Sequence, residues 1–463
     1  MKDRLNGLLE ALSHGLLERD AAVRLALLAA LAGEHVLLIG PPGTAKSALA
    51  RRLHGAFAGT RYFERLLTRF STPEELFGPL SLKALEDDRY ERLNEGFLPT
   101  AGIAFLDEVF KANSAILNAL LTLLNEREFD NGTARLRTPL IAVVAASNEV
   151  PTDDALQAFY DRFLVRVPVA PVGDECFGAL LSLRDEASPT ALEPLTPAER
   201  EHIAAAAQDV VLSPAFIEAC AALRRWLASQ GEPAVSDRRW RQIVALARTG
   251  AACEGRAALD AFDLWLAPYV ASAAPASAPA LQRWFERELL ALPVGPAPWL
   301  ERAVQAFEKQ LDIERQAPVD ETDDDGAGKL ALARAIGIGA GDEDSAAMQR
   351  VVSARLEERL RRRWSPVHIQ ARVDQVAEIE AQVAAARGDV AARAEAQARA
   401  LAGRLWMPQS LCKRLAAAHA HALVLLDDAA SRLAAARTGF AALPRDESRA
   451  DAPAPVAFEE AGA

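Results

Sequence analysis

Residues 40–47 read GPPGTAKS, which departs from the phosphate-binding pattern G-x-x-x-x-G-K-[ST] at one position, where Ala45 replaces the last glycine. The preceding run HVLLIG is apolar, as expected of a buried parallel strand, and the following run ALARRLHGAF has apolar residues at helical spacing. A loop between a strand and a helix points unpaired N–H groups and the positive end of the helix dipole toward an anion. The stretch therefore predicts an α/β P-loop NTPase, with an ordinary Pro-Gly turn as the alternative.

Each residue type in this loop has an expected use. Gly40 and Gly43 would let the backbone fold around a phosphate chain, Lys46 would reach the β and γ phosphates, and Ser47 would hold Mg²⁺. Ala45 is expected in the first helical turn with right-handed backbone angles, because the unusual angles are needed earlier in the loop. The predicted nucleotide-binding residues are Gly40, Pro41, Pro42, Gly43, Thr44, Ala45, Lys46, Ser47 and Ala48.

The bulk properties of the chain narrow its class. A length of 463 residues allows several domains with their own cores, and a net charge of −12 argues against bulk affinity for nucleic acid phosphates. No apolar run reaches the roughly 18 to 20 residues needed to span a bilayer, and the N-terminus lacks a signal-peptide core. We therefore expect a cytoplasmic protein without a membrane span.

Strand-like and helical runs alternate up to residue 171, which predicts an α/β domain with a parallel sheet over residues 1–171. The expected strands lie at 35–40, 62–68, 102–107, 139–147 and 163–169. Helical sequence alone follows, so an all-helical lid domain is expected over residues 172–271.

The remaining third of the chain has a different composition. The stretch SAAPASAPA at 272–280 predicts a linker, and charged, alanine-rich sequence predicts a helical arm or bundle over 281–443, interrupted by an acidic loop around 319–328. Residues 444–463 are expected to be disordered. The arm is interpreted as a surface for contact with a client protein, and a structural brace for the lid is the alternative.

Two polar groups follow the ends of predicted strands. GIAFLDEVF places Asp107 at a strand end, where it can hold Mg²⁺ through water, and Glu108 where it can orient an attacking water. Asn148, in SNE, could hydrogen-bond that water or the γ-phosphate. An acidic turn and a turn-capping Asn are the alternatives, and together with GPPGTAKS the NTPase interpretation is strongly favoured.

Two arginine-bearing motifs come later in the sequence. Arg162, in YDRF, precedes the last strand and could neutralise charge in a neighbouring subunit's site, although it could also pair with Asp161. In VSDRRW, Arg238 or Arg239 could project from a helical lid onto bound nucleotide, and a solvated basic turn is the alternative.

Four stretches in this order and spacing resemble the MoxR branch of the AAA+ ATPases, and they are GPPGTAKS, FLDEVFKANSAILNALLTLLNERE, SNE and DRF. TRFSTPEELFGPLSLKAL with NEGFLP is similar to the helix-2 insert of the regulatory ATPase variant A group, and REFDNGTARLRTPL is similar to its hairpin before the sensor strand. The resemblance covers about residues 5–270 and favours Arg238 as the second sensor. The C-terminal third lacks the strand pattern of that group's β-rich docking domain.

The resemblance implies ATP and Mg²⁺ as cofactors, a catalytic set of Glu108, Asn148, Arg162 and Arg238, and metal ligation by Ser47 and Asp107. It also implies a self-assembling ring, expected to be a hexamer, that hydrolyses ATP to remodel or activate a client protein, with a von Willebrand factor A domain protein as a candidate partner. A magnesium-chelatase-like motor subunit and a nucleic-acid-associated motor are the alternatives, the second of which the acidic charge disfavours.

Overall fold

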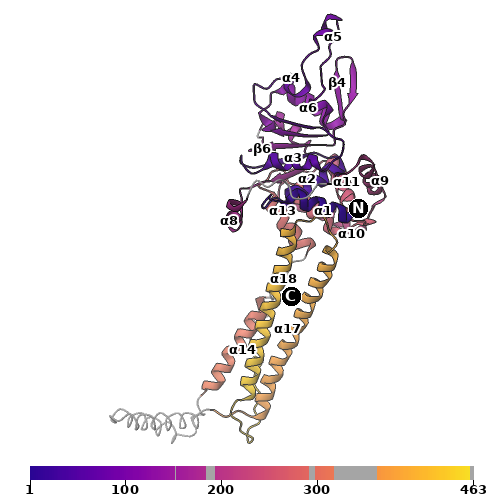
Figure 1. Ribbon diagram of the computed structural model, residues 1–463. Coiled ribbons are helices and arrows are strands. Elements are labelled where there is room, and N and C mark those ends of the chain that lie inside the picture. Colours follow the sequence, from indigo (N-terminus) through magenta and orange to yellow (C-terminus); the bar gives the residue numbers. More distant parts are fainter. Residues whose placement is uncertain (152, 184–192, 291–297, 318–361, 459–463) are drawn as a thin grey trace, which may run out of the picture. The chain divides into compact units, whose positions relative to one another are not determined.

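The computed structural model describes residues 1–151, 153–183, 193–290, 298–317 and 362–458 (Figure 1). The chain divides into two compact units, one formed by residues 1–291 with 400–413 and the other by residues 292–399 with 414–463. None of the helices within the described ranges is long and apolar enough to cross a membrane.

The first unit is built on a five-stranded parallel sheet with the strand order β2-β3-β6-β1-β7. Its strands are β1 (Val36–Ile39), β2 (Tyr62–Leu66), β3 (Ile103–Asp107), β6 (Ala142–Ser147) and β7 (Val165–Pro168). All five predicted strands are present, and the predicted α/β fold followed by helical regions is confirmed. Because the strands are parallel, the loops that follow β1, β3 and β6 meet at one edge of the sheet, called the carboxyl edge below.

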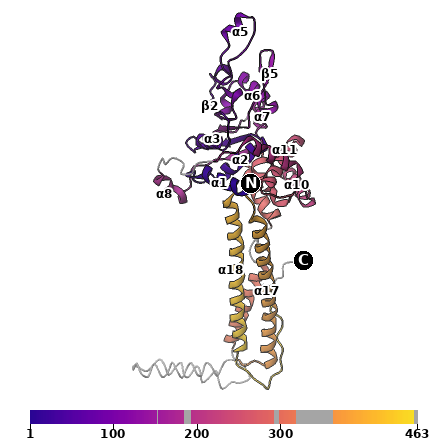
Figure 2. The same cartoon turned by 45° about the vertical axis from the view of Figure 1, so that its right-hand side comes forward.

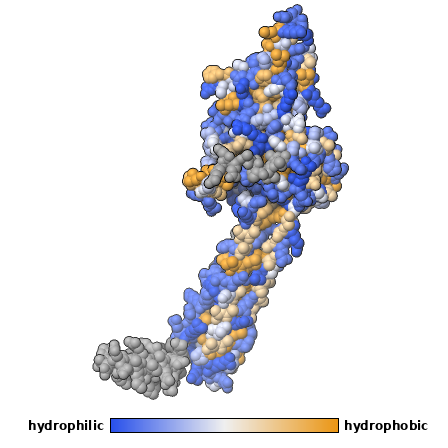
Figure 3. Space-filling view, in the orientation of Figure 1, coloured by the Kyte–Doolittle hydropathy of each residue, from blue (hydrophilic) through white to orange (hydrophobic). Residues whose placement is uncertain are grey.

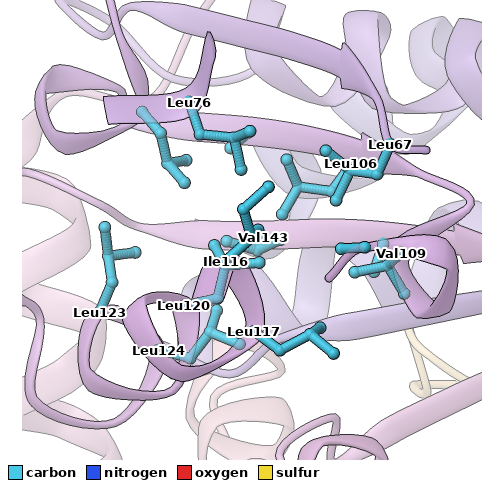
Figure 4. Packing of buried hydrophobic residues seen from close by; sticks show 14 of the residues in the cluster. Leu67, Leu76, Leu106, Val109, Ile116, Leu117, Leu120, Leu123, Leu124 and Val143 are labelled. Carbon is cyan, nitrogen blue, oxygen red and sulfur yellow. The ribbon is translucent and has the colours of Figure 1, made fainter. Parts of the chain in front are cut away.

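Helices cover the two faces of this sheet (Figure 1). They are α1 (Lys2–Ser13), α2 (Asp20–Ala32), α3 (Lys46–Gly55), α6 (Ser114–Glu126) and α7 (Asp154–Tyr160). The apolar face of α6, with Ile116, Leu120 and Leu123 fully buried, packs on side chains of β3 and β6 such as Leu106 and Val143 (Figure 4). This packing fixes the strand ends that hold the polar groups of the site.

Two insertions project from the same end of the first unit in both views (Figures 1 and 2). The first carries α4 (Pro73–Phe77) and α5 (Leu82–Glu86) between β2 and β3. The second is an antiparallel hairpin of β4 (Glu128–Asn131) and β5 (Ala134–Arg137). The side chain of Asn131 hydrogen-bonds the backbone of Arg92 at both its N–H and its carbonyl, so the two insertions support each other.

A helical region follows β7. Its helices are α8 (Asp174–Ser182), α9 (Pro197–Asp209), α10 (Pro214–Ser229), α11 (Asp237–Cys253), α12 (Ala267–Val270) and α13 (Ala278–Trp284). The region is helical as predicted, apart from a short parallel pair of β8 (Val211–Leu212) with β9 (Ala258–Leu259).

The linker expected at 272–280 is instead part of the first unit. Ser272 is buried and its carbonyl accepts a hydrogen bond from Arg166 Nη1 at 3.1 Å, and α13 begins at Ala278. The small residues of this stretch allow it to pack closely. Composition alone cannot distinguish such a packed segment from a flexible linker.

The first unit also contains residues 400–413, which the sequence analysis assigned to the arm. Trp406 is 2% exposed and donates from Nε1 to the carbonyl of Gly250 at 3.2 Å, and Arg404 pairs with Asp260 and Asp263. A segment distant in sequence therefore completes the core around α11, so the compact unit extends beyond the bounds of 172–271 that the sequence predicts for the lid domain.

The second unit is helical, as predicted for the arm. Its helices are α14 (Pro298–Gln316), α17 (Pro366–Leu401) and α18 (Gln409–Ala441), of which the last residues of α17 and the first of α18 belong to the first unit. Helices α17 and α18 lie side by side (Figure 2), joined by an ion pair of 2.6 Å between Arg387 and Asp427. The acidic loop expected around 319–328 lies outside the described residues.

The C-terminal tail was predicted to be disordered, but residues 444–458 pack on the second unit. The tail carbonyls of Asp451 and Ala454 accept hydrogen bonds from the side chains of Ser365 and Arg372, and the ring of Phe458 lies 6.2 Å from that of Phe307. The two hydrogen bonds are accepted by backbone carbonyls of the tail. Because every residue has a backbone carbonyl, the composition of the tail does not predict these contacts. The last five residues of the expected tail lie outside the described residues.

Candidate functional site

The GPPGTAKS loop lies between β1 and α3, as the sequence predicts. Gly40 has no room for a side chain, because a Cβ atom there would lie 2.0 Å from the carbonyl oxygen of Val169, and Gly43 has a φ of +79°. Lys46 is buried, and its Nζ donates to the carbonyls of Gly40 at 2.6 Å and Pro41 at 2.8 Å. Both glycines are therefore needed by the backbone of this loop, as expected. Gly40 is needed because a side chain would clash with Val169, and Gly43 is needed because its φ is positive.

Ala45 does not have the right-handed backbone expected of it. Its angles are φ +65° and ψ +25°, in the left-handed region, and it is the N-cap of α3, which begins at Lys46. The prediction placed Ala45 one position too far into the helix, and the residue instead has the conformation that favours glycine in such loops. A non-glycine residue in this region costs roughly 1 to 2 kcal/mol.

This strain gives a first test. We expect Ala45→Gly to raise the free energy of unfolding by up to about 1 kcal/mol, because relief of the left-handed alanine exceeds the added freedom of glycine in the unfolded chain. The matched control is Ala48→Gly, in the first turn of α3, where glycine should lower stability by about 0.5 to 1 kcal/mol. Urea unfolding midpoints measure both, and a loss of stability in Ala45→Gly would show that the position is unstrained.

The polar residues predicted to follow the strand ends lie together at the carboxyl edge. Asp107 ends β3, and its Oδ1 accepts a hydrogen bond from the N–H of Glu108 at 3.0 Å. Asn148 follows β6 and donates from Nδ2 to Oε1 of Glu108 at 2.5 Å. Burial lowers the pKa of the Lys46 amine, while the charges of Asp107 and Glu108 oppose that shift. The lysine of the loop and both carboxylates therefore interact in one site.

Glu108 has a strained backbone. Its φ is +51° and its ψ +43°, and its side chain also pairs with Lys111 at 3.3 Å. Left-handed conformations in residues other than glycine cost about 1 to 3 kcal/mol and concentrate at functional sites. Together with Asn148, Glu108 lines a pocket of about 280 Å³, a volume large enough to hold water.

Arg19, which the sequence analysis did not single out, anchors the loop from the other side. The residue is buried at the start of α2 and donates from Nε to the carbonyl of Thr44 at 3.1 Å and from Nη2 to that of Ala170 at 2.6 Å. It stands in an ordinary charged stretch, so no pattern in the sequence marks it.

Arg162 lies at the amino ends of the parallel strands, whereas the phosphate loop lies at their carboxyl ends. It precedes β7, which is parallel to β1, so about four residues of strand, or about 13 Å, separate its end of the sheet from Gly40. Asp161 pairs with Arg166 at 3.4 Å and Arg239 at 3.1 Å, and the buried Nε of Arg162 has no hydrogen-bond partner among the described residues. The described residues show no ion pair between Arg162 and Asp161, although the charge of Asp161 acts to raise the pKa of Arg162.

Arg238 and Arg239 have different surroundings. Arg239 is 5% exposed and donates to the carbonyls of Val270 and Leu164, which makes it part of the packing of α11 on the sheet. Arg238 is exposed and donates to Asn125 Oδ1 at 3.0 Å. Burial lowers the pKa of Arg162, and the charge of Arg238 lowers it further, so these two arginines lie near each other.

The residues present fit a nucleoside triphosphate with Mg²⁺. The first N–H groups of α3 have no partner within the helix and face the loop, and Lys46 adds a positive charge beside them. Ser47, the second residue of α3, and Asp107 supply the oxygen ligands that Mg²⁺ prefers. At Gly43 no atom lies within 4 Å of where a Cβ would stand, so the loop has open space beside it at this residue.

Comparisons with known proteins match two consecutive parts of this chain. A model described as the MoxR domain of MoxR-vWA-beta-propeller ternary systems matches residues 3–205, and a model of the AAA lid domain matches residues 216–285. Two uncharacterised proteins of Methanocaldococcus jannaschii are 50% identical over 182 residues and 49% identical over 188 residues. These alignments cover 39% and 40% of this chain, and 48% and 49% of the relatives.

Protein MoxR of Paracoccus denitrificans is 31% identical over 173 residues, which are 36% of this chain and 50% of that protein. The chain thus spans about half the length of these curated relatives. A crystal structure from Cytophaga hutchinsonii superposes with a TM-score of 0.47 and 18% identity over 58% of this chain and 86% of that one.

The parallel sheet, phosphate loop and helical lid define a P-loop NTPase. Residues 3–205 and 216–285 match the MoxR domain and the lid domain of a MoxR-family AAA+ ATPase. The resemblance to the regulatory ATPase variant A group stays a prediction.

Proposed function

We propose that this chain is a Mg²⁺-dependent ATPase that assembles into a ring, with six subunits as the proposed number, and uses hydrolysis to remodel or activate a partner protein. The observation that carries the proposal is the division of polar groups between two edges of one sheet. Lys46, Asp107 and Glu108 lie at the carboxyl edge, whereas Arg162 and Arg238 lie at the other.

In this proposal each residue of the carboxyl edge has one task. The loop from Gly40 to Ala48 binds the phosphates through its N–H groups, and Lys46 contacts the β and γ phosphates. Ser47 and Asp107 would hold Mg²⁺, which would neutralise charge on the phosphate oxygens. Glu108, held by Asn148, orients and polarises the attacking water.

In this proposal Arg162 and Arg238 act on the nucleotide of a second subunit. A guanidinium about 13 Å from its own phosphate loop along the strands cannot contact the γ-phosphate there, but it can contact that of a neighbour stacked head to tail. A contact between opposite edges of identical subunits is heterologous, and such contacts close into rings when the rotation permits. Arg162 and Arg238 would then act together, which replaces the expected contact of a lid arginine with its own nucleotide.

For partners, we propose a protein with a von Willebrand factor A domain. The description of the matching family model, which names MoxR, vWA and β-propeller components, supports this assignment. The helical second unit is proposed to contact the client, because no residue predicted to bind phosphate, metal or water lies in it. The overall charge of −12 speaks against nucleic acid as the client, and action in the cytoplasm is part of the proposal.

The test of nucleotide binding is Lys46→Ala. Loss of a charge-assisted contact to phosphate, about 1.5 to 3 kcal/mol, should weaken ATP binding about 10- to 100-fold. Lys83→Ala, an exposed lysine on α5, is the matched control and should bind as the unaltered chain does. Titration with a fluorescent ATP analogue measures both, and equal affinity in the two variants would remove Lys46 from the phosphate site.

A further inference from the structure

Helix α8 presents an apolar face that nothing in the described chain covers. Phe177, Leu180 and Leu181 stand at positions i, i+3 and i+4, so they share one side of the helix. They are 52%, 39% and 72% exposed, and no residue of α8 is buried (Figure 3). Exposed apolar clusters of this kind mark interaction sites.

A hollow of matching chemistry lies in the same unit, between α2, α9 and α11. Its volume is about 580 Å³, and apolar side chains such as Leu31, Trp240 and Val244 line it. Its charged lining residues are Arg241 and Arg248, and the buried Nε of Arg248 has no hydrogen-bond partner among the described residues.

Helix α8 lies on one side of α2, and α9 and α11, which help line the hollow, lie on the other side (Figures 1 and 2). At the start of α2, Arg19 bonds the phosphate loop, and Glu18 Oε2 accepts from the N–H of Gly173, directly before α8. At the far end, Leu31 and Ala32 line the hollow. A helix of 13 residues spans about 20 Å, so α8 cannot fill the hollow of its own chain while these bonds hold it.

The hollow is also continuous with the edge that carries the arginines. Glu34, two residues after Ala32, accepts a hydrogen bond from Gln242 at 2.9 Å, and Gln242 lies on α11 four residues after Arg238 and directly after Arg241 of the hollow. The phosphate loop and α8 thus share one end of the subunit, and Arg238 and the hollow share the other.

We infer that α8 of one subunit docks into the α2-α9-α11 hollow of the next copy of this chain. The inference rests on the proposed ring and specifies its contact. Phe177, Leu180 and Leu181 fill the apolar part of the hollow, while Asp174 and Glu175, in the first turn of α8, meet Arg241 and Arg248. This contact brings the arginine edge of one subunit toward the phosphate loop of its neighbour, the direction that the arginines require.

The experiment uses the full chain. Leu181→Asp should abolish ATP-dependent assembly in size-exclusion chromatography with light scattering, and should lower turnover at least tenfold while ATP affinity stays unchanged. Val424→Asp, at another exposed apolar residue, which lies on α18 and is 63% exposed, is the control and should assemble normally. A Leu181→Asp chain that assembles and turns over as the control does would overturn the inference, yet leave the proposed ATPase standing.

Crosslinking tests the same contact without disrupting it. Cysteines introduced as Leu181→Cys in one batch and Ala245→Cys, at the hollow, in another should form a covalent dimer on mixing with ATP and oxidant. Both variants also carry Cys176→Ser, because Cys176 lies on α8 itself, and each batch alone should then give no such dimer above the level that the remaining native cysteines produce. Rings that assemble from the mixture without this crosslink would contradict the docking, whereas failure of the unaltered chain to bind ATP would contradict the proposed function itself.

Discussion

Glu108→Gln is expected to bind ATP with unchanged affinity and to hydrolyse it at least ~10²-fold more slowly. Removal of a general base costs about 10²- to 10⁴-fold in rate, while the amide keeps the shape of the side chain and its neighbours in the pocket. The carboxylate lies beside Lys46 and Asn148, so the loss falls on the step in which water attacks and not on phosphate binding. Single-turnover hydrolysis and equilibrium ATP binding, measured on the same preparation, separate the two effects.

The matched control is Glu149→Gln, which removes one carboxylate from the same pocket. Glu149 is exposed, and its contact with Ser147 uses the backbone carbonyl and not the side chain. We expect this variant to turn over ATP within about twofold of the unaltered chain. Normal turnover in Glu108→Gln, or an equal loss in both variants, would remove Glu108 from the mechanism. A ring that binds ATP without hydrolysing it should also retain its client, which makes Glu108→Gln the bait for identifying that protein.

Much of this site could be predicted because its residues are adjacent in sequence to the elements that hold them. The strand β1 is an unbroken apolar run, and the helix after the loop begins at the lysine, so the position of the phosphate site follows from local sequence. The same holds for Asp107, which ends β3. Parallel strands then bring these loops to one edge without any further information.

What could not be predicted depends on backbone angles and on contacts between distant segments. The left-handed angles of Ala45 follow from where α3 begins, and helix boundaries are not fixed by composition to within one residue. Trp406 reaches the core around Gly250 across 156 residues of sequence, and the stretch at 272–280 packs although its composition is typical of a linker. Neither long-range contact leaves a periodic signal in its own segment.

The choice between Arg238 and Arg239 required the structure as well as the sequence. Both residues open α11, one after the other, and the family resemblance favoured the first. In the structure the guanidinium of Arg239 makes contacts within its own chain. It donates to the carbonyls of Leu164, directly before β7, and of Val270 in α12, and it forms an ion pair with Asp161. Arg238, one residue earlier, is exposed and donates to the side chain of Asn125, so it is the arginine that the proposed contact between subunits uses.

Arg162→Ala is expected to cut ATP turnover in the assembled ring by about 10³-fold or more and to leave the nucleotide affinity of an isolated subunit unchanged. An arginine supplied by a neighbour contributes about 10³- to 10⁵-fold to phosphoryl transfer. The control is Arg69→Ala, an exposed arginine in the β2–β3 insertion, which should change turnover by less than about twofold. Reduced ATP affinity in monomeric Arg162→Ala would instead place the residue in its own subunit's site.

A mixing experiment distinguishes a shared site from any defect within one subunit. In a ring that contains both Arg162→Ala and Lys46→Ala chains, an intact site forms wherever the phosphate loop of the first faces the Arg162 of the second. Because these residues lie at opposite edges of each subunit, neither variant completes a site alone, yet the mixture should recover activity in proportion to such pairs. Rings verified to contain both chains but without any recovery would show that Arg162 acts only within its own subunit, and the head-to-tail arrangement of active sites would then be wrong.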